Sequence, residues 1–312
     1  MELPFSSARK TTPLIYKKHY EQIQSYYASP ESRIGYRLIL GGTRHFGYYD
    51  RDTYWPFPLF KSLRKMEDKL AAALDLPNWA HVLDAGCGYG LVAMRMAETH
   101  GLRVSAIDLV ERHVKHAKQN IARSGLPGGA ITVQQGDYLN LEHIADESLD
   151  GVYTMETVVH AADPEAVLRN FYRVLKPGEH LAQFKYDNNI KKQDKHIDVA
   201  MRKVNEFAAM PTNAKSSPGA FKQMLEDAGF EDAGFEDVVV RDYSANILPM
   251  SRFFFLLAIV PLFLYGCSGW RNTSSTRLPE LGRTWGVASG IISPSLQRNR
   301  EVRLRSQRRS EN

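Results

Sequence analysis

The sequence predicts an α/β fold, with helices on both faces of a mostly parallel, doubly wound sheet. Short apolar runs alternate along residues 76–190 with segments whose apolar residues recur at helical spacing. This alternation is typical of a parallel sheet, because each helix returns the chain to the edge where the next strand starts. The expected strands are His81–Asp84, Leu102–Ile107, Ala130–Gln135, Leu149–Met155, Glu179–Lys185 and Asp237–Tyr243.

A glycine turn follows the first of these strands. Gly86, Gly88 and Gly90 alternate with other residues just before the expected helix Leu91–Glu98. Such a turn lets a ligand approach the backbone and meet the N–H groups of the helix start. Asp108 ends the second strand, where a carboxylate can accept both hydroxyls of a ribose. The unit therefore predicts a site for a nucleoside-containing cofactor.

The glycine spacing narrows the choice of cofactor. A dinucleotide site would place a third glycine at position 91, which is Leu91. Asp84, two residues before Gly86, would repel a pyrophosphate and suits a cation. S-adenosylmethionine carries a sulfonium, an amino group and an adenosine, so it fits both acids. The alternative is a structural strand–turn–helix with incidental glycines.

Two further acidic residues fall at the same predicted edge of the sheet. Asp137 follows the third strand, where it could meet the exocyclic amine of adenine, and Glu156 follows the fourth. Because ligands of such sheets lie at the carboxyl ends of the strands, this placement supports the cofactor hypothesis.

Residues 1–75 are predicted to form a helical, aromatic segment. Tyr16, Tyr20, Tyr26 and Tyr27 recur at helical spacing, which is typical of core packing or of a lid over an apolar pocket. His45 lies in a glycine-flanked loop beside aromatic residues, where it is a structural residue or a catalytic candidate.

The charge is distributed unevenly. The formal net charge is +5, but residues 271–312 hold nine Arg and three acidic residues, so the rest of the chain sums to −1. A nearly neutral main domain argues against a nucleic-acid partner. The two cysteines, Cys87 and Cys267, make neither a disulfide framework nor a metal site. With no apolar signal core at the amino terminus, we expect a cytoplasmic protein.

The C-terminal third is predicted to be less regular. Residues 191–267 hold a helical insertion, the remaining core elements and an apolar window at Phe253–Gly266, which Pro261 interrupts. This window is too short to span a bilayer, and we expect it to pack beside the substrate pocket and contact a membrane face. Residues 268–312 form an Arg-rich tail, for which we expect partial disorder, no regular seventh strand and attraction to anionic lipid.

The motifs VLDAGCGYG, SAIDL, QGDYLNL, YTMETVVHAADP and FYRVLKPGE resemble those of the class I S-adenosylmethionine-dependent methyltransferases. Within that class the chain is most similar to the sterol C24-methyltransferase family and its fungal small-molecule relatives. The resemblance implies a Rossmann-like methyltransferase sheet whose final strand should fall in the tail. It also implies that Glu156 and His160 face the methyl group or the substrate. The cofactor-binding residues expected from the motifs and the resemblance are Asp84, Gly86, Cys87, Gly88, Gly90, Asp108, Leu109, Asp137, Tyr138 and Met155.

The sequence therefore predicts methyl transfer from S-adenosylmethionine to a lipophilic small molecule at C, O or N. The methyl group of a sulfonium is already activated, so the enzyme mainly supplies proximity and alignment, and no metal is expected. For a hydroxyl or amine nucleophile, His160 or His45 is the candidate base. For an alkene, aromatic faces and Glu156 would stabilise a carbocation. The alternative is a cofactor-binding pseudoenzyme that acts as a regulatory subunit.

Overall fold

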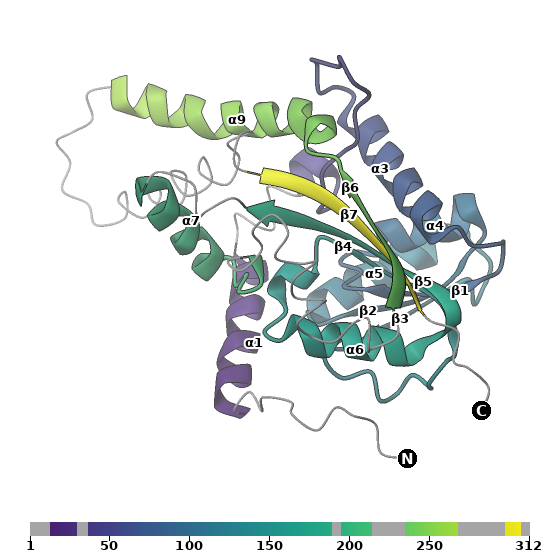
Figure 1. The fold of residues 1–312 in the computed structure, drawn as a ribbon. Helices are drawn as coiled ribbons and strands as arrows, with labels where there is room; N and C mark the ends of the chain where they lie inside the picture. The colour runs from purple at the N-terminus through teal and green to yellow at the C-terminus, as the bar shows by residue number, and fades with distance from the viewer. Residues whose placement is uncertain (1–12, 30–36, 189–194, 214–234, 268–296, 307–312) are drawn as a thin grey trace.

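The computed structural model describes residues 13–29, 37–188, 195–213, 235–267 and 297–306. Its centre is one seven-stranded sheet with the strand order β3-β2-β1-β4-β5-β7-β6 (Figure 1). The strands are β1 His81–Ala85, β2 Arg103–Asp108, β3 Ile131–Gln135, β4 Leu149–Met155, β5 Leu175–Asn188, β6 Phe235–Asp242 and β7 Gln297–Ser306.

The first five strands are parallel, as the sequence predicts. β1 is an interior strand that pairs with β2 on one side and β4 on the other, so the glycine turn after β1 lies between two neighbouring strand ends. The predicted α/β fold with a mostly parallel sheet is confirmed. The principal helices are α1 Pro13–Ala28, α3 Leu59–Leu74, α4 Leu91–His100, α5 Glu111–Arg123, α6 Pro164–Val174, α7 Lys195–Phe207 and α9 Leu248–Cys267.

Helices cover both faces of the sheet, and the alternation of side chains along the strands creates two cores. On one face Val82 of β1 packs with Met66 and Leu70 of α3 and with Met96 of α4. On the other face Leu83 packs in a cluster that includes Phe171 of α6. Since neighbouring strand residues point to opposite faces, each strand supplies both cores, and the continuous apolar runs of the sequence follow from this.

The prediction that the Arg-rich tail forms no regular seventh strand is wrong; residues 268–296 and 307–312 of the tail lie outside the described residues. Residues 297–306 form β7, which lies between β5 and β6 and is antiparallel to both. Val302 and Leu304 are fully buried in the core beneath α6, while Arg303 and Arg305 are half-buried. The sequence did not predict this strand because one of its buried positions is Glu301. A charged residue at that position hides the apolar pattern by which a buried strand is recognised. In the fold, Glu301 is paired with Arg241 and Tyr243 of the neighbouring segment.

The apolar window belongs to α9, which continues through Pro261. Figure 1 shows α9 running along the top of the molecule and extending beyond the strands. Among the described helices, none is long and apolar enough to cross a membrane. Part of the predicted helical insertion, at residues 189–194 and 214–234, lies outside the described residues.

Candidate active site

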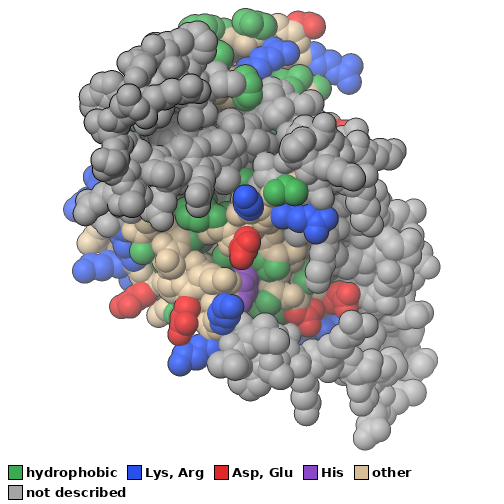
Figure 2. Space-filling model, turned by 90° about the vertical axis from the view of Figure 1, so that its left-hand side faces the viewer, with side chains coloured by type: hydrophobic (Ala, Val, Ile, Leu, Met, Phe, Trp, Pro, Cys, Tyr) green, Lys and Arg blue, Asp and Glu red, His purple; other side chains and the backbone are tan. Residues whose placement is uncertain are grey.

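A pocket opens at the carboxyl ends of β1, β2 and β4, with α1 lying over it. Its lining comes from the glycine turn, the loops after the strands, the segment 42–45 and α1. The space between protein atoms, counted out to the open mouth, is about 1320 Å³. On the side of the molecule that faces the viewer in Figure 2, acidic and basic side chains and a histidine are interspersed between the grey atoms.

The predicted cofactor residues gather in this pocket. Of the ten predicted, nine line it; Gly90 does not. Gly90 begins α4 with φ +75°, and a Cβ there would lie 3.1 Å from Ala117 of α5, so its role is to let the two helices pack.

The glycine turn is held against β2 and the loop after β4. The N–H groups of Gly86 and Cys87 both donate to the carbonyl of Ile107. Gly86 has φ +101°, and a Cβ at this position would lie 2.6 Å from Thr157, so only glycine fits. Gly88 also has a positive φ, +55°, but nothing lies within 4 Å of where its Cβ would be. Gly88 therefore leaves open space on the pocket side of the turn, where a ligand can approach the backbone.

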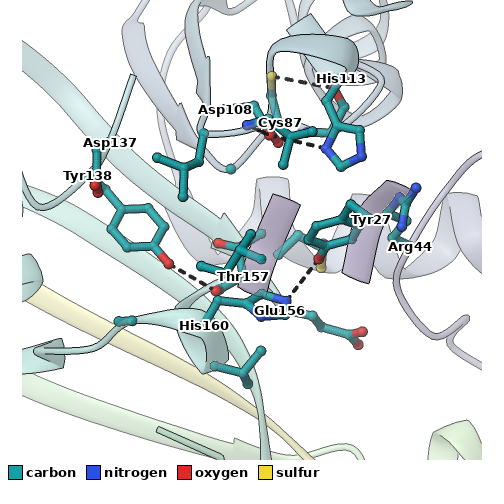
Figure 3. A pocket seen from close by; sticks show the side chains of 18 of the residues that line it. Tyr27, Arg44, Cys87, Asp108, His113, Asp137, Tyr138, Glu156, Thr157 and His160 are labelled. Atoms are coloured by element: carbon teal, nitrogen blue, oxygen red, sulfur yellow. Dashed lines mark hydrogen bonds and ion pairs between the residues drawn. The ribbon is translucent and has the colours of Figure 1, made fainter. Parts of the chain in front are cut away.

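Asp108 fixes both the turn and the next helix. Its Oδ2 accepts from the Gly88 N–H at 2.8 Å, and its Oδ1 accepts from the Val110 N–H at 2.8 Å. Nδ1 of His113, on α5, lies 3.1 Å from the same Oδ1 (Figure 3). These contacts hold the carboxylate at the edge of the pocket, in the place expected for a ribose-binding acid.

Asp84 is a buried carboxyl at the base of the pocket. Its Oδ2 has no hydrogen-bond partner among the described residues. Burial raises the pKa of Asp84 to about 7; the neighbouring Tyr153 hydroxyl lowers the pKa in part, and the Asp108 charge raises it further. A buried carboxyl with an unsatisfied oxygen favours a cationic partner, because such a partner would compensate for the lost hydration.

Asp137 and Tyr138 form another part of the wall. Oδ1 of Asp137 accepts from the Leu139 N–H, and burial raises the pKa of Asp137. The Tyr138 hydroxyl donates to the Thr157 carbonyl at 3.2 Å, which ties the loop after β3 to the loop after β4 (Figure 3). Cys87 also lines the pocket, and burial raises the pKa of its thiol, so the thiol stays protonated.

His160 is held on both ring nitrogens. Nδ1 lies 3.0 Å from the carbonyl of Ala209, which can only accept, so Nδ1 carries the proton. Nε2 then accepts from the Tyr27 hydroxyl at 2.8 Å (Figure 3). Burial lowers the pKa of His160 to about 4, so the ring is neutral near pH 7. This geometry makes His160 an anchor for α1.

Glu156 and His45 meet through the backbone of Phe46. Glu156 has φ +59° and is buried at the end of β4; its Oε1 accepts from the Phe46 N–H at 3.2 Å. His45 donates from Nδ1 to the Phe46 carbonyl, and its Nε2 lies 3.4 Å from Glu67 of α3. Burial lowers the pKa of His45, but the carboxylates of Glu67 and Glu156 outweigh it and raise the pKa above 6.5. His45 therefore lines the pocket while its ring is directed to α3.

The structure adds pocket residues that the sequence did not single out. Arg44 lies with its guanidinium 4.7 Å from the Tyr27 ring centroid and 5.5 Å from that of Tyr89. His113 and Thr157 contact the predicted turn, as described above. The five-residue spacing from Asp108 to His113 was the available signal for His113, whereas Arg44 had none. For the tyrosine stripe, the lid interpretation is supported, since Tyr16, Tyr20, Tyr26 and Tyr27 all line the pocket.

The comparisons with known proteins agree with this geometry. Residues 83–182 match the model of a family described as a methyltransferase domain. The chain is 41% identical to an S-adenosyl-L-methionine-dependent Diels-Alderase of Talaromyces variabilis, over 77% of this chain and 81% of the relative. It is 29% identical to an O-methyltransferase of Aspergillus sclerotiorum, over 81% of this chain and 91% of the relative. The crystal structure of the cyclase SpnF superimposes with a TM-score of 0.67 at 19% identity, covering 93% of this chain and 97% of that one.

The chain belongs to the class I S-adenosylmethionine-dependent methyltransferase family. Its cofactor is S-adenosylmethionine, as predicted. The residues fit this cofactor, because the unpartnered Oδ2 of Asp84 suits its cationic end and the open space beside Gly88 suits a close approach to the backbone. The finer placement near sterol C24-methyltransferases is supported only distantly. The sterol 24-C-methyltransferase of Aspergillus fumigatus is 28% identical over 59% of this chain and 54% of the relative.

Proposed function

We propose that this protein binds S-adenosylmethionine beside a lipophilic polyene and catalyses an intramolecular cyclisation of the Diels-Alder type. The observation that carries the proposal is His160, the predicted base, which is neutral and has both ring nitrogens engaged. A cycloaddition moves only electron pairs within the substrate, forming two carbon–carbon σ bonds at the expense of π bonds. It has no leaving group and needs no base, so it matches a pocket in which the histidine positions α1.

The pocket walls suit such a substrate. Aromatic side chains of α1 cover one side, and Leu91, Val92 and Met155 are also in the lining. These apolar and aromatic walls lie in the same pocket as the predicted cofactor residues Asp84 and Asp108, so a polyene held there would lie next to the cofactor. Holding a diene and a dienophile in contact lowers the barrier by removing conformational freedom before the reaction. The similarity to a Diels-Alderase at 41% identity supports this assignment.

Arg44 is the candidate group for polarising the dienophile. Its guanidinium is fixed against the rings of Tyr27 and Tyr89 and lines the pocket. A hydrogen bond from a cation to a carbonyl conjugated with the dienophile would withdraw electron density and stabilise the transition state. Bound S-adenosylmethionine supplies a second positive charge, the sulfonium.

The second candidate function is methyl transfer to a lipophilic small molecule. The family and the likeness to an O-methyltransferase support it. In that case Glu156 and His45 are the remaining acid–base candidates, since both line the pocket. The atom that accepts the methyl group would then lie in line with the sulfonium.

One experiment separates these functions. The purified protein is incubated with an extract of lipophilic metabolites and with S-adenosylmethionine labelled in its methyl group, and products are analysed by mass spectrometry. Cyclisation gives a product of unchanged mass, no label in the product and no S-adenosylhomocysteine. Methyl transfer adds a labelled CH₂ equivalent and releases S-adenosylhomocysteine.

Removing the cofactor and mutating its site provide the controls. Both functions predict that activity disappears when S-adenosylmethionine is stripped and returns when it is added. Asp108→Ala should weaken cofactor binding by about 1–3 kcal/mol, because it removes an acceptor from the site. Cofactor binding without any product, in extracts that contain polyenes, would contradict both functions and favour the regulatory alternative.

A further inference from the structure

An exposed aromatic surface lies on the segment before α3, on the first turn of α3 and on the first half of α9. We call it the aromatic face; it comprises Tyr54, Trp55, Phe57, Phe60, Leu256 and Leu257. The two segments are in contact, because the rings of Phe57 and Phe253 lie 5.0 Å apart. Figure 1 shows the loop that precedes α3 beside the N-terminal end of α9, at the top of the molecule. Trp55 is 66% exposed and Phe60 is 65% exposed, although both are large and apolar. Grouped exposure of this kind marks an interaction surface.

Cations accompany the rings of this face. The guanidinium of Arg252 lies 5.2 Å from the Tyr54 ring centroid, and that of Arg64 lies 4.8 Å from the Phe60 ring centroid. Arg51 before α3 and Lys61 in its first turn are also exposed. Two exposed acids, Asp50 and Asp52, flank Arg51, and Arg64 is ion-paired with the buried Glu67. Tryptophan and tyrosine beside basic residues are the combination that proteins use at the surface of an anionic bilayer.

The aromatic face rests on rings that are packed in the core. The rings of Phe253 and Phe254 lie 5.8 Å apart, and those of Phe254 and Phe46 lie 6.0 Å apart. Phe46 is buried and donates its N–H to Glu156 in the pocket wall. The exposed rings of Trp55 and Phe57 are thus supported by rings packed in the core, which hold the aromatic face in a fixed position.

We propose that the aromatic face docks the protein on an anionic membrane surface. This docking does not depend on the proposed function. A second copy of the chain is a poorer occupant. A two-fold symmetric contact would place this surface against itself and bring like-charged guanidinium groups together.

Vesicle flotation of the full chain tests the docking. Vesicles of phosphatidylcholine with and without phosphatidylserine are compared at low and high salt, using wild type, Trp55→Ala/Phe60→Ala and Trp79→Ala. Trp79 is 74% exposed, lies outside the aromatic face and serves as the matched control. We expect wild type and Trp79→Ala to float with phosphatidylserine vesicles, less so at high salt. The double variant should bind at least about tenfold more weakly, because two rings no longer insert.

Two further measurements make the result decisive. Melting curves and S-adenosylmethionine binding by calorimetry are expected to be unchanged in all three proteins, so loss of flotation would reflect the surface and not the fold. Failure of docking with intact cofactor binding and turnover would overturn this inference and leave the proposed function standing. Equal loss in Trp79→Ala would also overturn it. The inference would also be overturned if wild type sedimented as a dimer and the double variant as a monomer, because a second copy of the chain would then occupy the aromatic face.

Discussion

The Tyr27 hydroxyl donates to Nε2 of His160 across 133 positions of sequence, at 2.8 Å. This bond attaches α1 to the loop after β4 and sets one wall of the pocket. The His160 ring is fixed from its other side by the Ala209 carbonyl, so three distant segments meet at one imidazole.

Replacing Tyr27 by Phe should therefore loosen α1. The change leaves Nε2 of the buried His160 without its donor, and we expect the free energy of unfolding to fall by about 1 kcal/mol. Hydrogen exchange of the α1 amides should also become faster. Tyr20→Phe is the control, since Tyr20 lines the same pocket from the same helix. Equal changes in both variants would mean that the Tyr27–His160 bond does not hold α1 in place.

Cofactor affinity should depend on pH through Asp84. Burial raises the pKa of Asp84 from 3.8 to about 7, so the carboxyl is partly protonated near neutrality. Because the folded-state pKa is above that of the unfolded chain, the contribution of Asp84 to the free energy of unfolding is present below about pH 4 and lost as the pH rises through 7. Binding a cationic ligand needs the ionised form, so affinity should rise about tenfold per pH unit below 7. Calorimetry from about pH 5.5 to 7.5 measures this, and Asp84→Asn should abolish the slope. If affinity still rises with pH in Asp84→Asn, the pH dependence belongs to another titrating group.

The two glycines Gly86 and Gly88 should respond differently to alanine. Gly86→Ala should reduce the free energy of unfolding by about 2–4 kcal/mol, because the new methyl meets Thr157 and the backbone has a positive φ. Gly88→Ala should cost only about 1 kcal/mol, since its Cβ meets no protein atom. Cofactor affinity should nevertheless fall at least about tenfold in Gly88→Ala, because the methyl fills the approach to the backbone. Denaturant unfolding with calorimetry checks both, and normal affinity in Gly88→Ala would place the cofactor elsewhere.

Under methyl transfer, the second candidate function, Glu156→Gln should lower turnover at least about tenfold while cofactor affinity changes little; cyclisation, which needs no base, should change little. The amide keeps an acceptor for the Phe46 N–H but loses the charge at the substrate end of the pocket. Turnover in the metabolite assay and affinity by calorimetry separate the two effects. Glu165→Gln, an exposed acid on α6, is the control. Unchanged turnover in Glu156→Gln would leave Glu156 a structural role.

Removing residues 297–312 should abolish cooperative unfolding, because it deletes β7 from between β5 and β6. Removing only 307–312 keeps β7 and should leave the melting temperature nearly unchanged. Thermal melts of the two truncations decide this. A cooperative transition in the protein that lacks residues 297–312 would show that the sheet folds without β7.

The sequence predicted the part of the site whose residues are close together in the chain. Asp84, Gly86, Gly88 and Asp108 lie on one strand–turn–helix–strand unit, and the backbone requirements of that unit restrict which residues can occupy it. Positive φ angles at the glycines and the pairing of β1 with β2 follow from local pattern and strand alternation. For the same reason the cofactor could be chosen from the spacing of acids and glycines alone.

Only the tertiary structure decided what lies opposite that unit. Whether Tyr27 faces solvent, core or pocket depends on where α1 packs. Bringing Tyr27 to His160 closes a loop of more than a hundred residues, and contacts between segments distant in sequence offset the entropy lost in doing so. The same holds for β7, where Glu301 is acceptable inside the sheet because Arg241 and Tyr243 come from 60 and 58 positions away to satisfy it. Local pattern determines which backbone shapes a segment can take, whereas the burial of a polar side chain is settled by partners that only the folded chain brings near.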